Sequence, residues 1–215
     1  MIVMSVNRAT ATEMSIGDRV VSTAIGKQGV DGRVAVGPDG LEGDEVGNRK
    51  HHGGRDQAVY AYGVEDYQWW EGELGEELPP GTFGENLTIE GLRSAELFIG
   101  DRLVIGDELV AEVTAPRIPC GTFAARMGDA GFVDRFRGAR RPGAYLRVIE
   151  PGSVGAGDLV SLRRAEPRSL RLTELFDLVY DRSATPDDLR RALTAPIAVR
   201  GRVDIERRLE WLAGS

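Results

Sequence analysis

Gly-Asp pairs that punctuate the chain limit its fold more than any other feature of the sequence. Several are followed at once by aliphatic or β-branched residues, as in Asp18-Arg19-Val20-Val21 and Asp158-Leu159-Val160. Glycine and aspartate favour tight turns, and short apolar segments between such turns are typical of strands. The pattern therefore predicts an antiparallel barrel or sandwich of many short strands. The pairs are Gly17-Asp18, Gly43-Asp44, Gly100-Asp101, Gly106-Asp107 and Gly157-Asp158.

The strands are expected in the apolar segments between these turns. The pattern predicts strands near 20–24, 32–36, 58–62, 96–99, 103–105, 109–114, 144–150 and 159–162. Gly106-Asp107 joins two of them at the spacing of a hairpin. Before residue 165, helices are predicted at 64–71, where the sequence is rich in aromatic residues, and as short turns at 122–127 and 132–137.

The composition and the hydrophobic periodicity of the sequence change near residue 165. Glycine disappears until Gly201, and one helical face is formed by Leu172, Leu175, Phe176 and Val179. Thr185 followed by Pro186 has the pattern of an N-cap and a first helical residue. We therefore divide the chain into a β domain at 1–165 and a three-helix extension at 166–215. Such short helices are not stable alone, so they should dock on the β domain or on a second copy in a homodimer.

The bulk composition favours a cytoplasmic protein that binds neither membranes nor nucleic acids. No apolar run approaches the roughly 18 residues that span a bilayer. The N-terminus lacks the basic and apolar regions of a signal peptide, and one cysteine suits a reducing compartment. A net charge of −7 argues against general nucleic-acid binding.

Cys120 is the only cysteine, and it ends the segment Pro116-Arg117-Ile118-Pro119-Cys120. The two prolines stiffen the connector after the predicted strand at 109–114, so they should hold the thiol in one place. Seven arginines against two aspartates between Arg117 and Arg147 give this segment a charge of 7 − 2 = +5. Concentrated positive charge should shift the thiol toward thiolate, the form that binds metals. The alternative is a small, inert core residue.

Both histidines lie in Lys50-His51-His52-Gly53-Gly54-Arg55-Asp56. Adjacent residues of an extended chain point to opposite sides, so His51 and His52 form a poor chelating pair. Arg55 and the amides of the glycines could hold an anion, and Asp56 could orient an imidazole or Arg55. A Cys120–His52 nucleophile pair, or a histidine that only caps a turn, are the alternatives. Glu85 and Asn86, directly before a predicted strand, offer hydrogen-bond donors and acceptors to the edge of a heterocycle. The alternative is a turn with no further role.

Together these segments resemble the MOSC domain family, named for the C-terminal part of molybdenum cofactor sulfurases, over roughly residues 20 to 162. The tail is similar to the three-helix extension of its stand-alone, YiiM-like bacterial branch. The matching segments are Gly26-Lys27, Gly40-Leu41-Glu42-Gly43-Asp44, His52-Gly53-Gly54-Arg55-Asp56, Gly84-Glu85-Asn86-Leu87-Thr88, Ile99-Gly100-Asp101, Pro116-Arg117-Ile118-Pro119-Cys120, Arg141-Pro142-Gly143-Ala144-Tyr145-Leu146-Arg147-Val148 and Gly157-Asp158.

The resemblance implies a mainly β fold: a closed or nearly closed, mostly antiparallel β-barrel with a few short helices. It implies that Cys120 meets molybdenum, or carries sulfur, in the pterin-based molybdenum cofactor. The implied cofactor-pocket residues are Lys27, Asp44, His52, Gly53, Gly54, Arg55, Glu85, Asn86 and Arg117. Gln57 stands where relatives often have lysine, so one cationic contact is expected to be missing.

Three functions remain open from the sequence. The first is a molybdenum-cofactor enzyme that reduces small N-hydroxylated compounds with electrons from an external donor protein. In this enzyme Cys120 would be the metal ligand, and the cofactor would carry the redox chemistry. The second is a module that carries the cofactor, or sulfur as a Cys120 persulfide, without turnover of its own. The third is a Cys/His hydrolase or a purely structural barrel.

Overall fold

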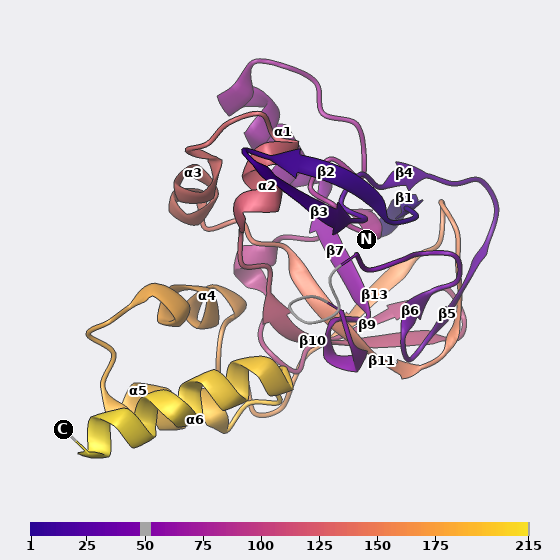
Figure 1. Ribbon diagram of the computed structural model, residues 1–215. Coiled ribbons are helices and arrows are strands. Elements are labelled where there is room, and N and C mark those ends of the chain that lie inside the picture. The colour runs from indigo at the N-terminus through magenta and orange to yellow at the C-terminus, as the bar shows by residue number, and fades with distance from the viewer. Residues whose placement is uncertain (48–52, 215) are drawn as a thin grey trace.

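The computed structural model describes residues 1–47 and 53–214, and its centre is a mixed sheet of eight strands (Figure 1). In the order of the sheet these are β13 (Val160–Arg163), β9 (Arg102–Ile105), β10 (Leu109–Pro116), β11 (Ala144–Glu150), β7 (Val59–Gly63), β8 (Leu87–Glu90), β1 (Ile2–Arg8) and β4 (Gln28–Gly29). Neighbouring strands are antiparallel except β7 and β8, which are parallel.

Two smaller sheets and six α-helices complete the described part of the chain. One sheet joins β12 (Gly152–Val154), β5 (Val34–Gly37) and β6 (Gly40–Leu41), and the other is the ribbon of β2 (Thr12–Ile16) and β3 (Arg19–Thr23). The helices are α1 (Val64–Leu74), α2 (Gly121–Arg126), α3 (Phe132–Ala139), α4 (Leu172–Tyr180), α5 (Pro186–Leu193) and α6 (Val199–Gly214). None of the helices in residues 1–47 and 53–214 has the length and apolar character needed to cross a membrane.

The expectation of a mainly β, closed or nearly closed barrel is wrong, because the large sheet is open and the fold is of the α/β kind. The sheet ends at β13 on one side and at β4 on the other. Ile2 forms a bridge with Leu159, but this bridge is isolated and is not part of a ladder between two strands. Helix α1 lies between β7 and β8 in the chain, which allows these strands to run parallel, as a crossover connection does.

Most predicted strands exist, and one does not. The hairpin at Gly106-Asp107 is confirmed, since β9 and β10 pair antiparallel from Ile105–Leu109 onward. The segment 96–99 is not a strand, because Glu96 ends a 3₁₀ turn and Phe98 forms only an isolated antiparallel bridge with Arg171. Leu172 donates to the carbonyl of Leu97 and Ile99 donates to that of Leu170, at 2.9 Å each. The start of the C-terminal region thus takes the place of a neighbouring strand.

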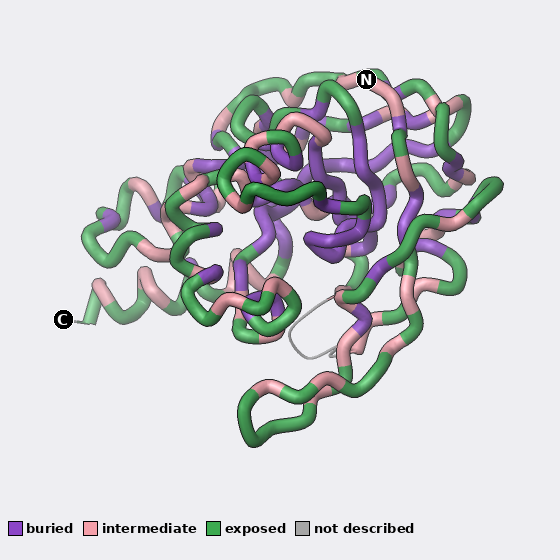
Figure 2. The backbone as a smooth tube through the Cα atoms, turned by 90° about the horizontal axis from the view of Figure 1, so that it is seen from above, coloured by how far each residue is buried: buried purple, intermediate pink, exposed green. Residues whose placement is uncertain are grey.

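Buried residues form an aliphatic core on the large sheet and an aromatic cluster under α1, α2 and α3. The buried rings of the second group are Tyr60, Tyr62, Tyr67, Trp70, Phe83, Phe123, Phe132, Phe136 and Phe176. Figure 2 shows the buried segments gathered at the centre of the molecule. The three C-terminal helices lie to one side of the sheet in Figure 1, yet their buried leucines belong to the aliphatic core. The division at residue 165 stays a prediction.

Candidate functional site

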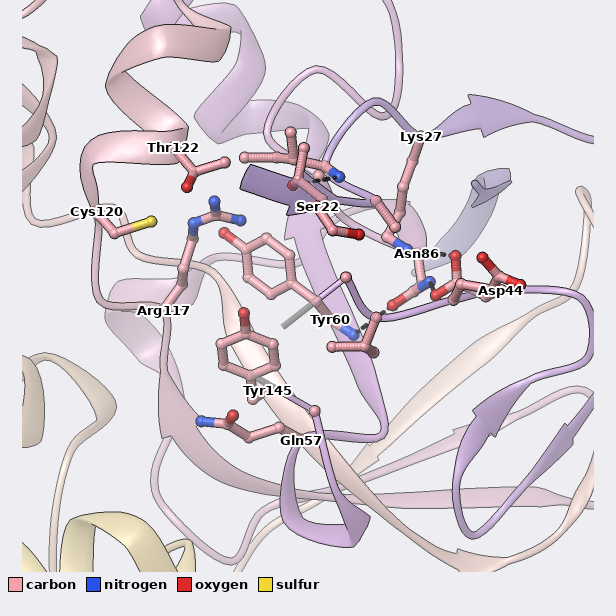
Figure 3. A pocket seen from close by; sticks show the side chains of 18 of the residues that line it. Ser22, Lys27, Asp44, Gln57, Tyr60, Asn86, Arg117, Cys120, Thr122 and Tyr145 are labelled. Carbon is pink, nitrogen blue, oxygen red and sulfur yellow. Dashed lines mark hydrogen bonds and ion pairs between the residues drawn. The ribbon is translucent and has the colours of Figure 1, made fainter. Parts of the chain in front are cut away.

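A cavity of about 500 Å³ opens between the β2–β3 ribbon and the large sheet (Figure 3). One wall comes from β3 and the segment that follows it, and the opposite wall from β7, the end of β10 and β11. The start of α2 closes one side. The side chains that matter below are those of Ser22, Lys27, Asp44, Gln57, Tyr60, Asn86, Arg117, Cys120, Thr122 and Tyr145.

Cys120 lines this cavity, immediately before the first turn of α2. Its backbone is extended (φ −140°, ψ 173°), and its carbonyl accepts hydrogen bonds from the amides of Phe123 and Ala124 at 3.0 and 3.1 Å. Its side chain is half-buried and points toward the cavity in Figure 3. Pro116 ends β10 and Pro119 lines the cavity beside the thiol. The stiff connector predicted from the two prolines therefore presents the thiol to an enclosed space.

Arg117 is a buried cation in the wall of the same cavity, with a relative exposure of 7%. One terminal nitrogen, Nη1, donates to the carbonyl of Phe83 at 2.6 Å, and the guanidinium carbon lies 4.2 Å from the centroid of the Phe123 ring. Burial acts to lower the pKa of Arg117, but Tyr60, Tyr145, Cys120 and Glu85 outweigh it and raise the pKa. Among the described residues no carboxylate forms an ion pair with Arg117, and its Nε lacks a hydrogen-bond partner. The site thus holds positive charge that an anion could use.

Lys27 and Asp44 form an ion pair at the edge of the cavity, and both side chains are buried. Oδ1 of Asp44 also accepts from the amide of Ala9 at 2.9 Å, and Oδ2 accepts from Nδ2 of Asn86 at 2.8 Å. Burial lowers the pKa of Lys27, and the neighbouring Asp44 partly offsets this effect. Asp44 therefore joins the base of the β2–β3 ribbon to the cavity wall.

Asn86 and Glu85 hold the turn before β8. Oδ1 of Asn86 accepts from the amide of Tyr60 at 3.0 Å, so this side chain faces both β7 and Asp44. Glu85 is fully buried behind the cavity and does not line it. Its Oε1 accepts from Tyr67 Oη, the amide of Gly81 and Thr88 Oγ1 at 2.6 to 2.7 Å. Burial raises the pKa of Glu85 despite these hydrogen bonds. Glu85 thus supports the site from behind.

The segment that contains the histidines is only partly brought to the cavity. Gly53 lines the cavity, with φ +72°, whereas Gly54 does not. The side chain of Arg55 is 77% exposed and faces Asp39 at 4.0 Å. The predicted cofactor contact at His52 lies outside the described residues. Asp56 accepts from Nε of Arg147 and from the amide of Val199, at 2.7 Å each, and not from Arg55.

The basic segment between Arg117 and Arg147 does not form one cationic surface around the thiol. Four of its seven arginines pair with carboxylates, and Arg137 stacks on Tyr180 at 4.3 Å. The four pairs are Arg135–Asp129, Arg140–Asp177, Arg141–Asp66 and Arg147–Asp56. Helix α3 and strand β11 spread these side chains over several faces. Only Arg117 of the seven lines the cavity.

Several lining residues were not among the predicted cofactor-pocket residues, although Tyr60 belongs to an aromatic group of the sequence that could line a pocket for a flat substrate. Tyr60 and Tyr145 form an aromatic wall, with ring centroids 4.9 Å apart and an angle of 35° between the planes. Gln57, noted in the sequence only as a departure, lines the cavity, and its Oε1 is buried without a hydrogen-bond partner among the described residues. Period-two alternation would place Tyr60 and Tyr145 on strands, but it does not show which sheet face meets a cavity. Ser22 and Thr122 carried no signal of their own.

The residues present fit the cofactor that the sequence implies. No group of three or more His, Cys, Asp or Glu side chains among the described residues could hold a bare metal ion. A single soft thiol suits a metal that brings further ligands with it, as a molybdenum–dithiolene centre does. Arg117 Nε and Gln57 Oε1 are buried polar atoms that a polar heterocycle with an anionic group would satisfy.

Comparison with known proteins places the chain in a family. The family model described as the MOSC domain matches residues 48–161. Protein YiiM of Escherichia coli is 35% identical over 62% of this chain and 61% of its own length, and the uncharacterized protein YflK of Bacillus subtilis is 34% identical over 76% and 74%. A protein named reductase from Gibberella moniliformis is 33% identical over 66% of this chain, which spans 26% of that protein.

Solved structures support the same relationship. The crystal structure of YiiM from Geobacillus stearothermophilus has a TM-score of 0.80 and 25% identity, covering 96% of this chain and 98% of its own. YiiM from Escherichia coli has a TM-score of 0.74 and 26% identity, covering 91% and 92%. The similarity therefore extends through the C-terminal helices, beyond the residues that the family model matches.

Proposed function

This chain belongs to the MOSC domain family and is similar to YiiM, and we propose that it binds a molybdenum cofactor through Cys120 and reduces N-hydroxylated compounds. The observation that carries the proposal is the cavity itself. It holds one half-buried thiol, an aromatic wall and one buried arginine for which residues 1–47 and 53–214 provide no carboxylate partner. A relative with the printed name reductase supports the reaction class.

Seven of the lining residues have a role in this proposal. Cys120 supplies the thiolate ligand to molybdenum, and Arg117 binds an anionic group of the cofactor with its free Nε edge. Lys27 and Asn86 present polar hydrogens at the far edge, where Asp44 fixes both side chains. Tyr60 and Tyr145 offer flat surfaces for a heterocycle or for the substrate. The cofactor, when bound, supplies the two-electron chemistry that no side chain of this site can provide.

The overall reaction consumes two electrons and two protons. The N–O bond of the substrate breaks, the nitrogen takes up one proton, and the oxygen takes up the other and leaves as water. An external electron donor protein supplies the electrons, and solvent supplies the protons through the open side of the cavity. A cytoplasmic location and a homodimer through the C-terminal helices belong to the proposal as well; light scattering in solution measures the second.

The test is the molybdenum and pterin content of the protein purified from a host that makes the cofactor. We expect near-stoichiometric molybdenum in the wild type and its loss in Cys120→Ala. Cys120→Ser should keep the fold and lose the reduction of hydroxylaminopurine-type bases. Full activity of Cys120→Ser would overturn the role of the thiol, and a wild type without molybdenum would overturn the cofactor.

A second candidate is a carrier that holds sulfur as a Cys120 persulfide. The observation in its favour is that the cavity offers a single thiol, while the described residues contain no cluster of three or more His, Cys, Asp or Glu side chains for a metal ion. Mass spectrometry of the freshly purified protein separates the two functions. A mass increase of one sulfur on Cys120, without molybdenum and without turnover, would support the carrier.

A further inference from the structure

The start of helix α6 is tied to the segment that lines the cavity. Asp56 lies in the short 3₁₀ turn Arg55–Gln57, directly before the lining residues Gln57 and Ala58. Its Oδ2 accepts a hydrogen bond of 2.7 Å from the amide of Val199, the first residue of α6. The first amides of a helix have no partner within the helix, and a carboxylate is favoured there by the helix dipole.

A second set of contacts holds the same turn against the sheet. Oδ1 of Asp56 accepts from Nε of Arg147 on β11 at 2.7 Å. Thr114 Oγ1, on β10, donates to the carbonyl of Asp56 at 2.5 Å and also approaches the carbonyl of Tyr145 at 3.2 Å. The amide of Ala198 donates to the carbonyl of Thr114 at 3.0 Å. The turn, the two strands and the start of α6 thus share one hydrogen-bond network.

The network lies next to the cavity. Gln57 lines the cavity and follows Asp56 in the chain. Tyr145 also lines the cavity, and its carbonyl lies near Thr114 Oγ1 of the network. Both side chains are labelled in the lower part of Figure 3. Burial raises the pKa of Tyr145, and the positive charges of Arg117 and Arg200 partly offset this effect. Arg200 lies in the first turn of α6. Helix α6 lies outside residues 48–161 that the family model matches.

We infer that Asp56 is a positioning residue through which helix α6 fixes the Gln57 side of the cavity, so that the C-terminal helices are part of the cofactor site. Two bonds to one carboxylate couple the turn to β11 and to α6 at once. Without them the turn would be held to the rest of the molecule mainly through its backbone. Only the cofactor arm of the test below rests on the proposed function.

Two variants break the link from opposite sides. Asp56→Ala removes the carboxylate. Val199→Pro removes the amide hydrogen with little other effect expected, because proline is tolerated at the first position of a helix and Val199 is 61% exposed. The matched control is Glu112→Gln, because Glu112 also binds Arg147 but its other hydrogen bond goes to Arg102 on β9. Asp56→Asn keeps one acceptor oxygen and should be intermediate.

Amide hydrogen exchange of the folded full chain is the first measurement. We expect exchange at 53–58 to be at least about tenfold faster in both Asp56→Ala and Val199→Pro, and unchanged in Glu112→Gln. Adding Val199→Pro to Asp56→Ala should change little, since Asp56→Ala already removes the bond to the Val199 amide. The inference is overturned if Val199→Pro speeds exchange only within α6, since the turn would then be fixed without the helix.

Molybdenum content per protein is the second measurement. We expect both variants to retain several-fold less molybdenum than the wild type, with Glu112→Gln at the wild-type level. Wild-type content in both variants would overturn the coupling to the site. If the wild type itself holds no molybdenum, the proposed function fails, and the exchange measurement alone decides whether α6 fixes the turn.

Discussion

Arg117 donates a hydrogen bond of 2.6 Å to the backbone carbonyl of Phe83, and this carbonyl, not a carboxylate, receives the buried guanidinium. A buried charge without a counter-charge costs free energy of folding. Binding of a ligand can offset this cost. The contact therefore supports a ligand-binding role for Arg117 and makes its replacement informative.

Arg117→Met should separate stability from binding. A methionine of similar length removes the buried charge, so we expect a free energy of unfolding within about 1 kcal/mol of the wild type, or higher. Molybdenum content should fall at least about tenfold, as expected when a charge-assisted hydrogen bond to an anion is lost. Urea unfolding and metal analysis measure the two effects. Arg126→Met, on an exposed residue of α2 outside the cavity lining, is the control. A loss of several kcal/mol in Arg117→Met would assign the arginine a structural role.

Glu85 should give the protein a characteristic pH dependence. Because burial raises the pKa of Glu85, the folded state holds its proton more tightly than the unfolded state does. Its contribution to stability is complete below the ordinary value of 4.5 and is lost as the pH rises through the raised pKa. The free energy of unfolding of the wild type relative to Glu85→Gln should therefore decline over that window.

Urea unfolding at a series of pH values measures this decline. Glu77→Gln is the control, since it removes an exposed carboxyl without touching the network around Tyr67. A difference between wild type and Glu85→Gln that stays constant with pH would contradict the prediction.

Lys27 and Asp44 should be strongly coupled energetically. Asp44→Asn leaves a buried ammonium group without its counter-charge, and we expect a loss of about 3 kcal/mol in the free energy of unfolding. Adding Lys27→Met should restore part of it. The double-mutant cycle gives the coupling energy, and the exposed pair Arg190–Asp187 is the comparison, where about 1 kcal/mol or less is expected. Equal coupling at both pairs would count against a desolvated pair at the cavity.

The sequence predicted local features better than the closure of the sheet. The turn at Gly106-Asp107 and the helices after residue 165 depend on nearby residues, and both are present. Strand β1 was not predicted, because neither of its partners gives a local signal. Strand β8 lies far along the chain, and strand β4 has only two residues. The closed barrel was wrong for a related reason. Whether Ile2 and Leu159 form a ladder or a single bridge depends on sheet twist, which turn residues do not specify.

The site was predictable where its functional residues lie close together in the sequence. Arg117 and Cys120 are three residues apart, and both reach the cavity. The charge of +5 along the same segment did not predict a cationic surface at the site. Carboxylates from α1, α4 and the 3₁₀ turn Arg55–Gln57, all distant in the chain, pair with three of its arginines. Asp56 was assigned to an imidazole or to Arg55, because its partner Val199 is 143 residues away.

Gly63 should test how tightly α1 and the parallel pair β7–β8 are joined. It ends β7, precedes α1, and pairs with Ile89 of β8. A Cβ at this position would lie 1.9 Å from the carbonyl oxygen of Leu92, so the backbone must move in Gly63→Ala. We expect a loss of about 3 kcal/mol or more in the free energy of unfolding. Gly72→Ala, within α1 and with no atom within 4 Å of the added Cβ, should instead gain about 0.5–1 kcal/mol. Urea unfolding measures both changes in the free energy of unfolding. Opposite signs for the two variants would establish that the close approach of the Leu92 carbonyl, and not the loss of a glycine, sets the cost at Gly63.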